Sequence, residues 1–243
     1  MDTPTRSLRC IPAWICGATS DAVTSARWIG RVVRPLVLLG GVVPGVVLVE
    51  RFLRDDLGAN PAEKLEHFTG TTALVILLLC LAVTPLRRLT GVNALIRLRK
   101  PIGLWSFAYA CVHFSCYLVF DQSLDLHEIL RDIVKRPYIT VGFTAFLLLL
   151  SLALTSSTWS VRKLGARGWG RLHALIYPAA GLGVIHYLWS VKRDVTVPVT
   201  LDAILVFLLA TRLWRGSGGG MAPPAAMDRR SKAERPQTGA VRP

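Results

Sequence analysis

The sequence predicts an all-α membrane protein, built as a bundle of six transmembrane helices. Hydrophobic residues make up 52% of the 243 positions, and the mean hydropathy is +0.44. These residues fall in six blocks rather than at the spacing of a soluble core. Most blocks approach or reach the ~20 residues that a helix needs to cross a ~30 Å hydrocarbon core. Lys and Arg gather in alternate gaps between the blocks, as they do in proteins that span a membrane several times.

The six predicted spans are, in order, residues 35–49, 67–86, 101–120, 138–155, 172–191 and 195–214. The first is the shortest and contains Pro44, so five spans remain the alternative. Residues 1–30 lack the apolar core of a signal peptide, and we expect a disordered extension there. Residues 216–243 are rich in Gly, Pro, Ala and Arg, which predicts a disordered basic tail. Residues 31–215 then form one membrane domain.

The distribution of basic residues predicts the orientation. The formal net charge is +14, and 21 of the 29 Lys and Arg residues lie in the two terminal segments and the gaps 87–100 and 156–171. The gaps 51–66, 121–136 and 192–194 hold the other 8. This bias places both termini in the cytoplasm. It leaves nucleic-acid binding open only for the basic tail.

The sequence shows no motif of a soluble nucleotide-binding or flavin-binding domain. No phosphate-binding loop or GxGxxG motif follows a strand-like segment, and the run "GSGGG" at 216–220 follows a predicted span. About thirty residues follow the last span, too few for a typical nucleotide or flavin domain. The five cysteines show no CxxC pair. We therefore expect the chain to act within the membrane or through partners.

Histidines inside the spans are the main functional signal, because ionisable groups in hydrocarbon are costly. His113 lies twelve residues after Pro101, ~18 Å into its span, and His186 lies fourteen residues after Leu172, ~21 Å along its own. The two are therefore expected at similar depths on separate helices. His67 falls at the outer interface, where a structural and a functional role remain equally open, and His127 falls in an outer loop.

His173 is expected at the inner end of the fifth span, ~20 Å from His186. Thirteen residues of ideal helix turn the chain by about 220°, so the two side chains would not share a face. Pro178 lies between them, and a proline kink would permit a common face.

Two imidazoles that meet between helices favour haem as the ligand. Zinc prefers four ligands, with Cys or carboxylate commonly among them, and no such cluster falls at this depth. Haem needs two axial ligands on opposite sides of a flat apolar ring, and helix bundles provide such sites. Aromatic residues that could line the site, or serve ordinary packing, are Trp105, Phe107, Tyr109, Phe114, Tyr177, Tyr187 and Trp189.

Several stretches between about residues 57 and 214 resemble one family. They are "HFTG" (67–70), "TPLRR" (84–88), "GLWSFAYACVHF" (103–114), "RPYITVGF" (136–143), "RKLG" (162–165), "RLHALIY" (171–177) and "IHYLWSVK" (185–192). The chain is identified by them as a member of the MsrQ family, formerly YedZ, which belongs with the ferric-reductase-like membrane domains. The resemblance implies one b-type haem, with a second left open, and ligands at His113, His173 and His186.

The resemblance also implies a function and partners. Electrons from the quinone pool, or from a cytosolic flavin donor, would cross the bacterial inner membrane through haem. They would reach a periplasmic molybdopterin enzyme, MsrP, which reduces methionine sulfoxide in damaged proteins. FMN is implied by the resemblance alone, since the sequence identifies no FMN site.

The chain departs from the pattern of the related oxidases at one place, and two functions other than electron transfer remain open. No second histidine lies one haem-spacing inward of His113, where the chain has Arg99 and Lys100, which puts a second bis-histidine haem in doubt. The chain could instead transport protons or metal ions through a histidine relay, although such relays recruit acidic residues and only Asp202 lies within a span. It could also be a plain membrane anchor for a soluble partner.

Overall fold

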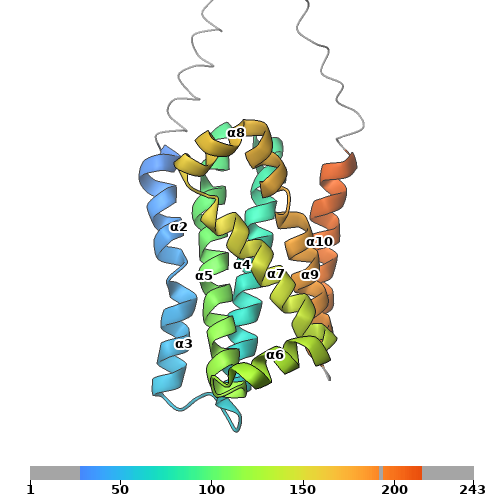
Figure 1. The fold of residues 1–243 in the computed structure, drawn as a ribbon. Coiled ribbons are helices and arrows are strands. Elements are labelled where there is room, and N and C mark those ends of the chain that lie inside the picture. The colour runs from blue at the N-terminus through green and yellow to red at the C-terminus, as the bar shows by residue number, and fades with distance from the viewer. Residues whose placement is uncertain (1–27, 192–193, 215–243) are drawn as a thin grey trace, which may run out of the picture.

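The computed structural model describes residues 28–191 and 194–214, and every regular element within those ranges is helical. An N-terminal rod, formed by the helical segments of residues 29–53, is followed by a bundle of helices, and two further helices lie across the ends of the bundle (Figure 1). The helices are α2 (Arg34–Gly40), α3 (Val43–Leu53), α4 (Pro61–Thr90), α5 (Arg99–Cys116), α6 (Leu126–Lys135), α7 (Pro137–Leu154), α8 (Thr158–His173), α9 (Ile176–Ser190) and α10 (Thr196–Trp214). Short 3₁₀ or π segments are Ile29–Val33, Asn93–Leu98 and Tyr117–Asp121.

The two ends of the bundle are marked by α8 and α6, which cross it in Figure 1. We call them the α8 end and the α6 end. The predicted loops 121–136 and 156–171 thus contain helices that the sequence analysis did not anticipate. Their caps explain them: Asp125 accepts hydrogen bonds from the first turn of α6, and Ser157 accepts one from Ser160 at the start of α8. Apart from residues 28–30, the predicted terminal extension and tail lie outside the described residues.

The central helix α4 has a clear local origin. The side chain of Asn60 accepts a hydrogen bond from the Glu63 amide, and Pro61 occupies the first helical position. Gly91 ends the helix with φ of 72°, a left-handed conformation that glycine adopts without steric cost. Between these signals lies a run of apolar residues, which gives a helix of 30 residues.

Four helical segments of the described chain are long and apolar enough to cross a membrane: Gly30–Leu53, Pro61–Thr90, Asn93–Asp121 and Pro137–Leu154. They coincide with the first four predicted spans. The fifth and sixth spans correspond to α9 and α10, of 15 and 19 residues. The all-α membrane architecture is therefore confirmed over the described residues, and the count of six crossings stays a prediction.

The fifth predicted span is shorter than expected, because the helix is interrupted at Ala174 and Leu175, between α8 and α9. Pro178 explains the break, because its missing N–H and its ring disfavour an α-helical bond to the carbonyl of Ala174. That carbonyl accepts from the amide of Tyr177 instead, at 3.1 Å. His173 therefore ends α8 rather than beginning the helix of His186, which corrects the expectation that the two share a helix.

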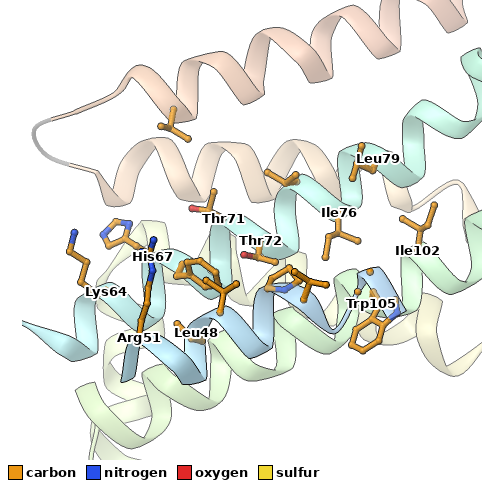
Figure 2. A pocket seen from close by; sticks show the side chains of 18 of the residues that line it. Leu48, Arg51, Lys64, His67, Thr71, Thr72, Ile76, Leu79, Ile102 and Trp105 are labelled. Atoms are coloured by element: carbon orange, nitrogen blue, oxygen red, sulfur yellow. The ribbon is translucent and has the colours of Figure 1, made fainter. Parts of the chain in front are cut away.

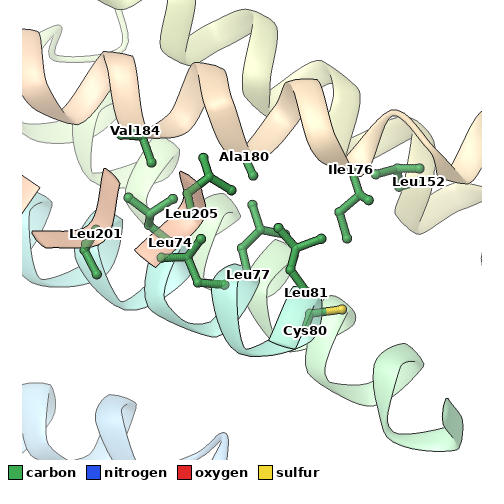
Figure 3. Close-up of a cluster of buried hydrophobic side chains, with 11 residues drawn as sticks. Leu74, Leu77, Cys80, Leu81, Leu152, Ile176, Ala180, Val184, Leu201 and Leu205 are labelled. Atoms are coloured by element: carbon green, nitrogen blue, oxygen red, sulfur yellow. The ribbon is translucent and has the colours of Figure 1, made fainter. Parts of the chain in front are cut away.

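The apolar core lies where α4, α7, α9 and α10 meet (Figure 3). Ala180 of α9 has no exposed surface, and Leu77 of α4 is 3% exposed. The buried members are Leu74, Leu77, Leu78, Cys80, Leu81, Leu152, Ile176, Ala180, Val184, Leu201 and Leu205. This core fixes α4 and α9 relative to each other, and with them the site described next.

The N-terminal rod is held more loosely, because neither α2 nor α3 contains a buried residue. Tyr109 of α5 fastens it by donating a hydrogen bond from its hydroxyl to the Gly41 carbonyl at 2.8 Å and accepting one from the Gly45 amide at 2.8 Å. The indole of Trp105 packs against Gly41 so closely that a Cβ there would overlap the ring.

Candidate functional site

His113 and His186 meet inside the bundle, as their predicted depths indicated. His113 comes from α5 and His186 from α9, and their ring centroids are 6.1 Å apart with an interplanar angle of 70°. Both rings line a cavity between α4, α5, α7 and α9. Two residues that are 73 positions apart in the sequence thus present their imidazoles to the same space.

Each ring is oriented by a backbone carbonyl. Nδ1 of His113 lies 3.0 Å from the Glu66 carbonyl oxygen of α4, and Nδ1 of His186 lies 2.7 Å from the Tyr138 carbonyl oxygen of α7. A carbonyl only accepts, so each Nδ1 carries the hydrogen and donates it. In a neutral imidazole Nε2 is then left with a free lone pair. Metal-binding histidines are commonly held in this way.

A glycine supports each ring, one helical turn beyond the carbonyl. A Cβ on Gly70 would lie 3.1 Å from Nδ1 and Cε1 of His113. A Cβ on Gly142 would lie only 2.5 Å from Nδ1 of His186. The glycines follow Glu66 and Tyr138 by four residues, so each ring lies against a notch in the neighbouring helix. Sequence reasoning missed both glycines, although Gly70 and Gly142 fall in stretches that carried the family resemblance.

The walls of the cavity are mostly apolar and aromatic. Phe114 of α5 stacks on Phe146 of α7 with centroids 4.9 Å apart, and Phe143 lies 5.8 Å from Phe114. Of the predicted aromatic residues, Phe114 and Tyr187 line this cavity, whereas Trp105 and Tyr109 face the N-terminal rod. Tyr117, Tyr138, Phe143 and Phe146 also line it and were not anticipated.

Polar side chains gather where the cavity approaches the α6 end. Glu66 and Asp121 line the cavity itself. Asp132 accepts hydrogen bonds from Tyr117 at 3.1 Å and from Gln122 at 3.0 Å, and it forms an ion pair with Arg136 at 2.7 Å. Sequence reasoning assigned no role to this network, which ties α6 to the bundle beside the paired histidines.

His67 borders the same cavity, with its ring 6.3 Å from that of Tyr187 and its Nε2 4.0 Å from Glu63 Oε1. His127 is exposed on α6. Within residues 28–191 and 194–214, no three side chains of His, Cys, Asp or Glu converge to bind a bare metal ion. Among the His, Cys, Asp and Glu side chains that line the cavity, His113 and His186 are the pair whose rings approach each other across it.

His173 lies apart from the pair, at the end of α8. Its ring stacks on Trp169 with centroids 3.9 Å apart, and its Nε2 lies 3.3 Å from Thr155 Oγ1. Trp169 donates from Nε1 to the Thr155 carbonyl at 2.9 Å. The structure thus brings together two of the three predicted haem ligands and gives the third a separate set of contacts.

Comparison with known proteins agrees with this architecture. The family model described as a ferric reductase like transmembrane component matches residues 69–184, which include His113 and end two residues before His186. The chain is 44% identical over 184 residues to the protein-methionine-sulfoxide reductase heme-binding subunit MsrQ of Herminiimonas arsenicoxydans, covering 75% of this chain and 84% of that protein.

Other relatives with the same name give similar values. Identity to the protein of Xanthomonas campestris pv. campestris (strain B100) is 49% over 181 residues, covering 72% of this chain and 83% of the relative. Identity to that of Ralstonia nicotianae is 46% over 186 residues, covering 76% and 86%. With this identity over most of each relative, the chain belongs to the MsrQ family.

Proposed function

We propose that the chain is a transmembrane electron-transfer subunit whose His113 and His186 hold one b-type haem as axial ligands. The observation that carries the proposal is the spacing of the pair. A ligand nitrogen lies about 2 Å from its metal, so two imidazoles on opposite sides of one iron have centroids about 6 Å apart. The measured separation is 6.1 Å. The residues present therefore fit the group that the relatives' names specify.

The tautomers of the two histidines and the apolar walls of the cavity also support the haem proposal. The Glu66 and Tyr138 carbonyls keep hydrogens on Nδ1 and leave both Nε2 atoms free to ligate. Phe114, Phe143 and Phe146 provide flat apolar surfaces beside the pair. A bound haem would supply a one-electron centre whose potential depends on its axial ligands and on burial.

The distribution of basic residues predicts the orientation of the chain, and the orientation sets the direction of electron transfer. With 21 basic residues on the predicted inner side and 8 on the other, both termini would lie in the cytoplasm of a bacterial inner membrane. The α6 end, and the histidine pair with it, would then face the periplasm. The chain would take electrons from the quinone pool or a cytosolic flavin donor and pass them to MsrP. FMN and a second haem at His173 remain predictions from the resemblance.

Absorption spectroscopy of three variants tests the proposal. The purified protein should carry haem, with a band that changes on reduction by dithionite. His113→Ala and His186→Ala should each lose most of it, whereas His127→Ala, which removes an exposed histidine on α6, should retain it. Full haem content in both site variants would refute the assignment. Protein with no haem that moved protons or metal ions would favour the transporter.

A further inference from the structure

A second, larger cavity lies between the N-terminal rod and the bundle, and it shares His67, Thr71 and Tyr187 with the cavity of the histidine pair. It has a volume of about 940 Å³ and runs along one face of α4, with α3 on the other side (Figure 2). Apolar side chains form most of its length: Val37, Val43, Val47, Leu48, Phe68, Val75, Ile76, Leu79 and Ile102. We refer to it as the rod groove.

The rod groove lies at a depth where water is scarce. Its walls belong to Gly30–Leu53 and Pro61–Thr90, two of the segments able to cross a membrane. Because α2 and α3 bury no residue of their own, the rod does not close the space by packing into it. Unfilled apolar walls forfeit dispersion contacts, so hydrocarbon from the surroundings is the favoured filling.

One end of the groove is charged. Arg51 and Lys64 lie there with His67, and Figure 2 shows the nitrogens of the three side chains gathered at that end. Neither Arg51 nor Lys64 takes part in an ion pair within the described part of the chain. Asp56 also lines this end. The two cations and the one carboxylate sum to a single positive charge.

The length of the groove matches one lipid molecule. From Lys64 to Leu79 the lining follows α4 for fifteen residues, which is ~22 Å of helix. One leaflet, counted from the headgroups to the bilayer centre, is ~20–22 Å thick. A lipid with its phosphate at Arg51 and Lys64 would therefore extend an acyl chain about as far as Leu79.

We propose that the rod groove binds one anionic phospholipid, whose headgroup phosphate pairs with Arg51 and Lys64 and whose acyl chain fills the space beside Val75 and Leu79. A basic pocket between transmembrane helices attracts an anionic headgroup through the opposite charges of the two. A quinol carries no charge and would leave the net positive charge of this end uncompensated. The lipid would join the rod to the bundle, a role beyond the proposed electron transfer.

Lipid retention by the purified full-length protein tests the proposal. Native mass spectrometry, with quantified lipid extraction after extensive detergent washing, should find about one phosphatidylglycerol per chain. The double variant Arg51→Gln/Lys64→Gln should reduce retention at least tenfold. The matched control is Arg54→Gln/Arg131→Gln, which removes two positive charges that are paired with Glu50 and Glu128 outside the groove. This control should retain the lipid.

A second variant keeps the test valid if the double variant folds poorly. Val75→Trp leaves the cations in place and fills the apolar part of the groove, so it should also release the lipid.

Absence of retained lipid in the wild type, or equal retention in all variants, would overturn the proposal. Displacement of the lipid by ubiquinol would make the groove a quinol site. Displacement by millimolar inorganic phosphate would reduce it to an anion site, and preference for phosphatidylethanolamine would refute the charge argument.

Discussion

The imidazole of His186 lies directly against the backbone of Gly142, where a Cβ would come within 2.5 Å of Nδ1, 2.7 Å of Cε1 and 2.9 Å of Cγ. The same ring donates to the carbonyl of Tyr138, four residues earlier on α7. His113 repeats the arrangement on α4 with the Glu66 carbonyl and Gly70. Two histidines are thus aimed by the same device, a carbonyl and a glycine one turn apart.

Gly142→Ala should therefore displace His186. Relieving a contact of 2.5 Å requires the ring or α7 to move, and overpacking of this kind costs about 1–3 kcal/mol. If His186 is an axial ligand, haem affinity should fall about tenfold or more, since each 1.4 kcal/mol is a factor of ten. Titration of apoprotein with hemin, followed by absorption, measures the change.

The chain offers a graded series of controls for this prediction. Gly70→Ala meets His113 at 3.1 Å and should have a smaller effect, whereas a Cβ on Gly181 of α9 meets nothing within 4 Å. Gly181→Ala should leave haem affinity unchanged and add up to about 1 kcal/mol of helix stability. An equal loss of haem in all three variants would show that the glycines act through general stability and not through the rings.

Tyr109→Phe should loosen the N-terminal rod. The hydroxyl makes two hydrogen bonds to the rod, with Gly41 and Gly45, each worth roughly 0.5–1.5 kcal/mol. The phenyl ring would remain packed, so the bundle and its haem content should be preserved. Limited proteolysis in detergent should then cut the segment between α3 and α4 faster than in the wild type. Unchanged cleavage would mean that the Tyr109 hydroxyl does not hold the rod in place.

The sequence predicted the histidine pair because depth depends only on residue count along two helices. It could not predict the glycine notches, since a glycine inside an apolar run has many packing roles and the partner helix is unknown. It placed His173 on the helix of His186 because the apolar run 172–191 is continuous. The break comes from Pro178 acting on the preceding turn, and the hydropathy of the run carries no signal of it.

Orientation can be tested by labelling single cysteines. If both termini are cytoplasmic, a cysteine placed at Asn93, between α4 and α5, should be shielded from a membrane-impermeant maleimide added to intact spheroplasts. A cysteine at exposed His127 of α6 should react. The engineered positions are best introduced with all five native cysteines, Cys10, Cys16, Cys80, Cys111 and Cys116, replaced by alanine. Reaction at position 93 with protection at position 127 would invert the predicted topology.

Transfer to the periplasmic partner has its own readout. If the α6 end faces the periplasm, the reduced protein should lose its reduced-haem spectrum when oxidised MsrP is added anaerobically. The acceptor would have to approach beside α6, because Glu66 and Asp121 line the site's cavity toward that end. Leu130→Glu places a charge on the exposed face of α6 and should slow the reaction without changing haem content. The matched control is Leu89→Glu, which adds the same charge at an exposed position near the end of α4, in the gap 87–100, and should leave the rate unchanged. If neither the wild type nor any variant is oxidised by MsrP, the partner assignment fails.

Variants of His173 can show whether this residue is a haem ligand, the point at which electrons enter from the donor (the inlet), or a structural residue. Its ring stacks on Trp169 and its Nε2 lies near Thr155, at the end of α8 where the donor side is predicted. If it serves as an inlet, His173→Ala should retain the haem of the His113–His186 pair and slow its reduction by quinol or by a flavin reductase, whereas His186→Ala should abolish that haem. If it ligates a second haem, His173→Ala should halve the haem-to-protein ratio. His173→Gln, which can still bond to Thr155, separates the structural role: recovery of the native reduction rate in this variant would assign the position to packing of α8, because glutamine preserves the hydrogen bond but supplies no imidazole.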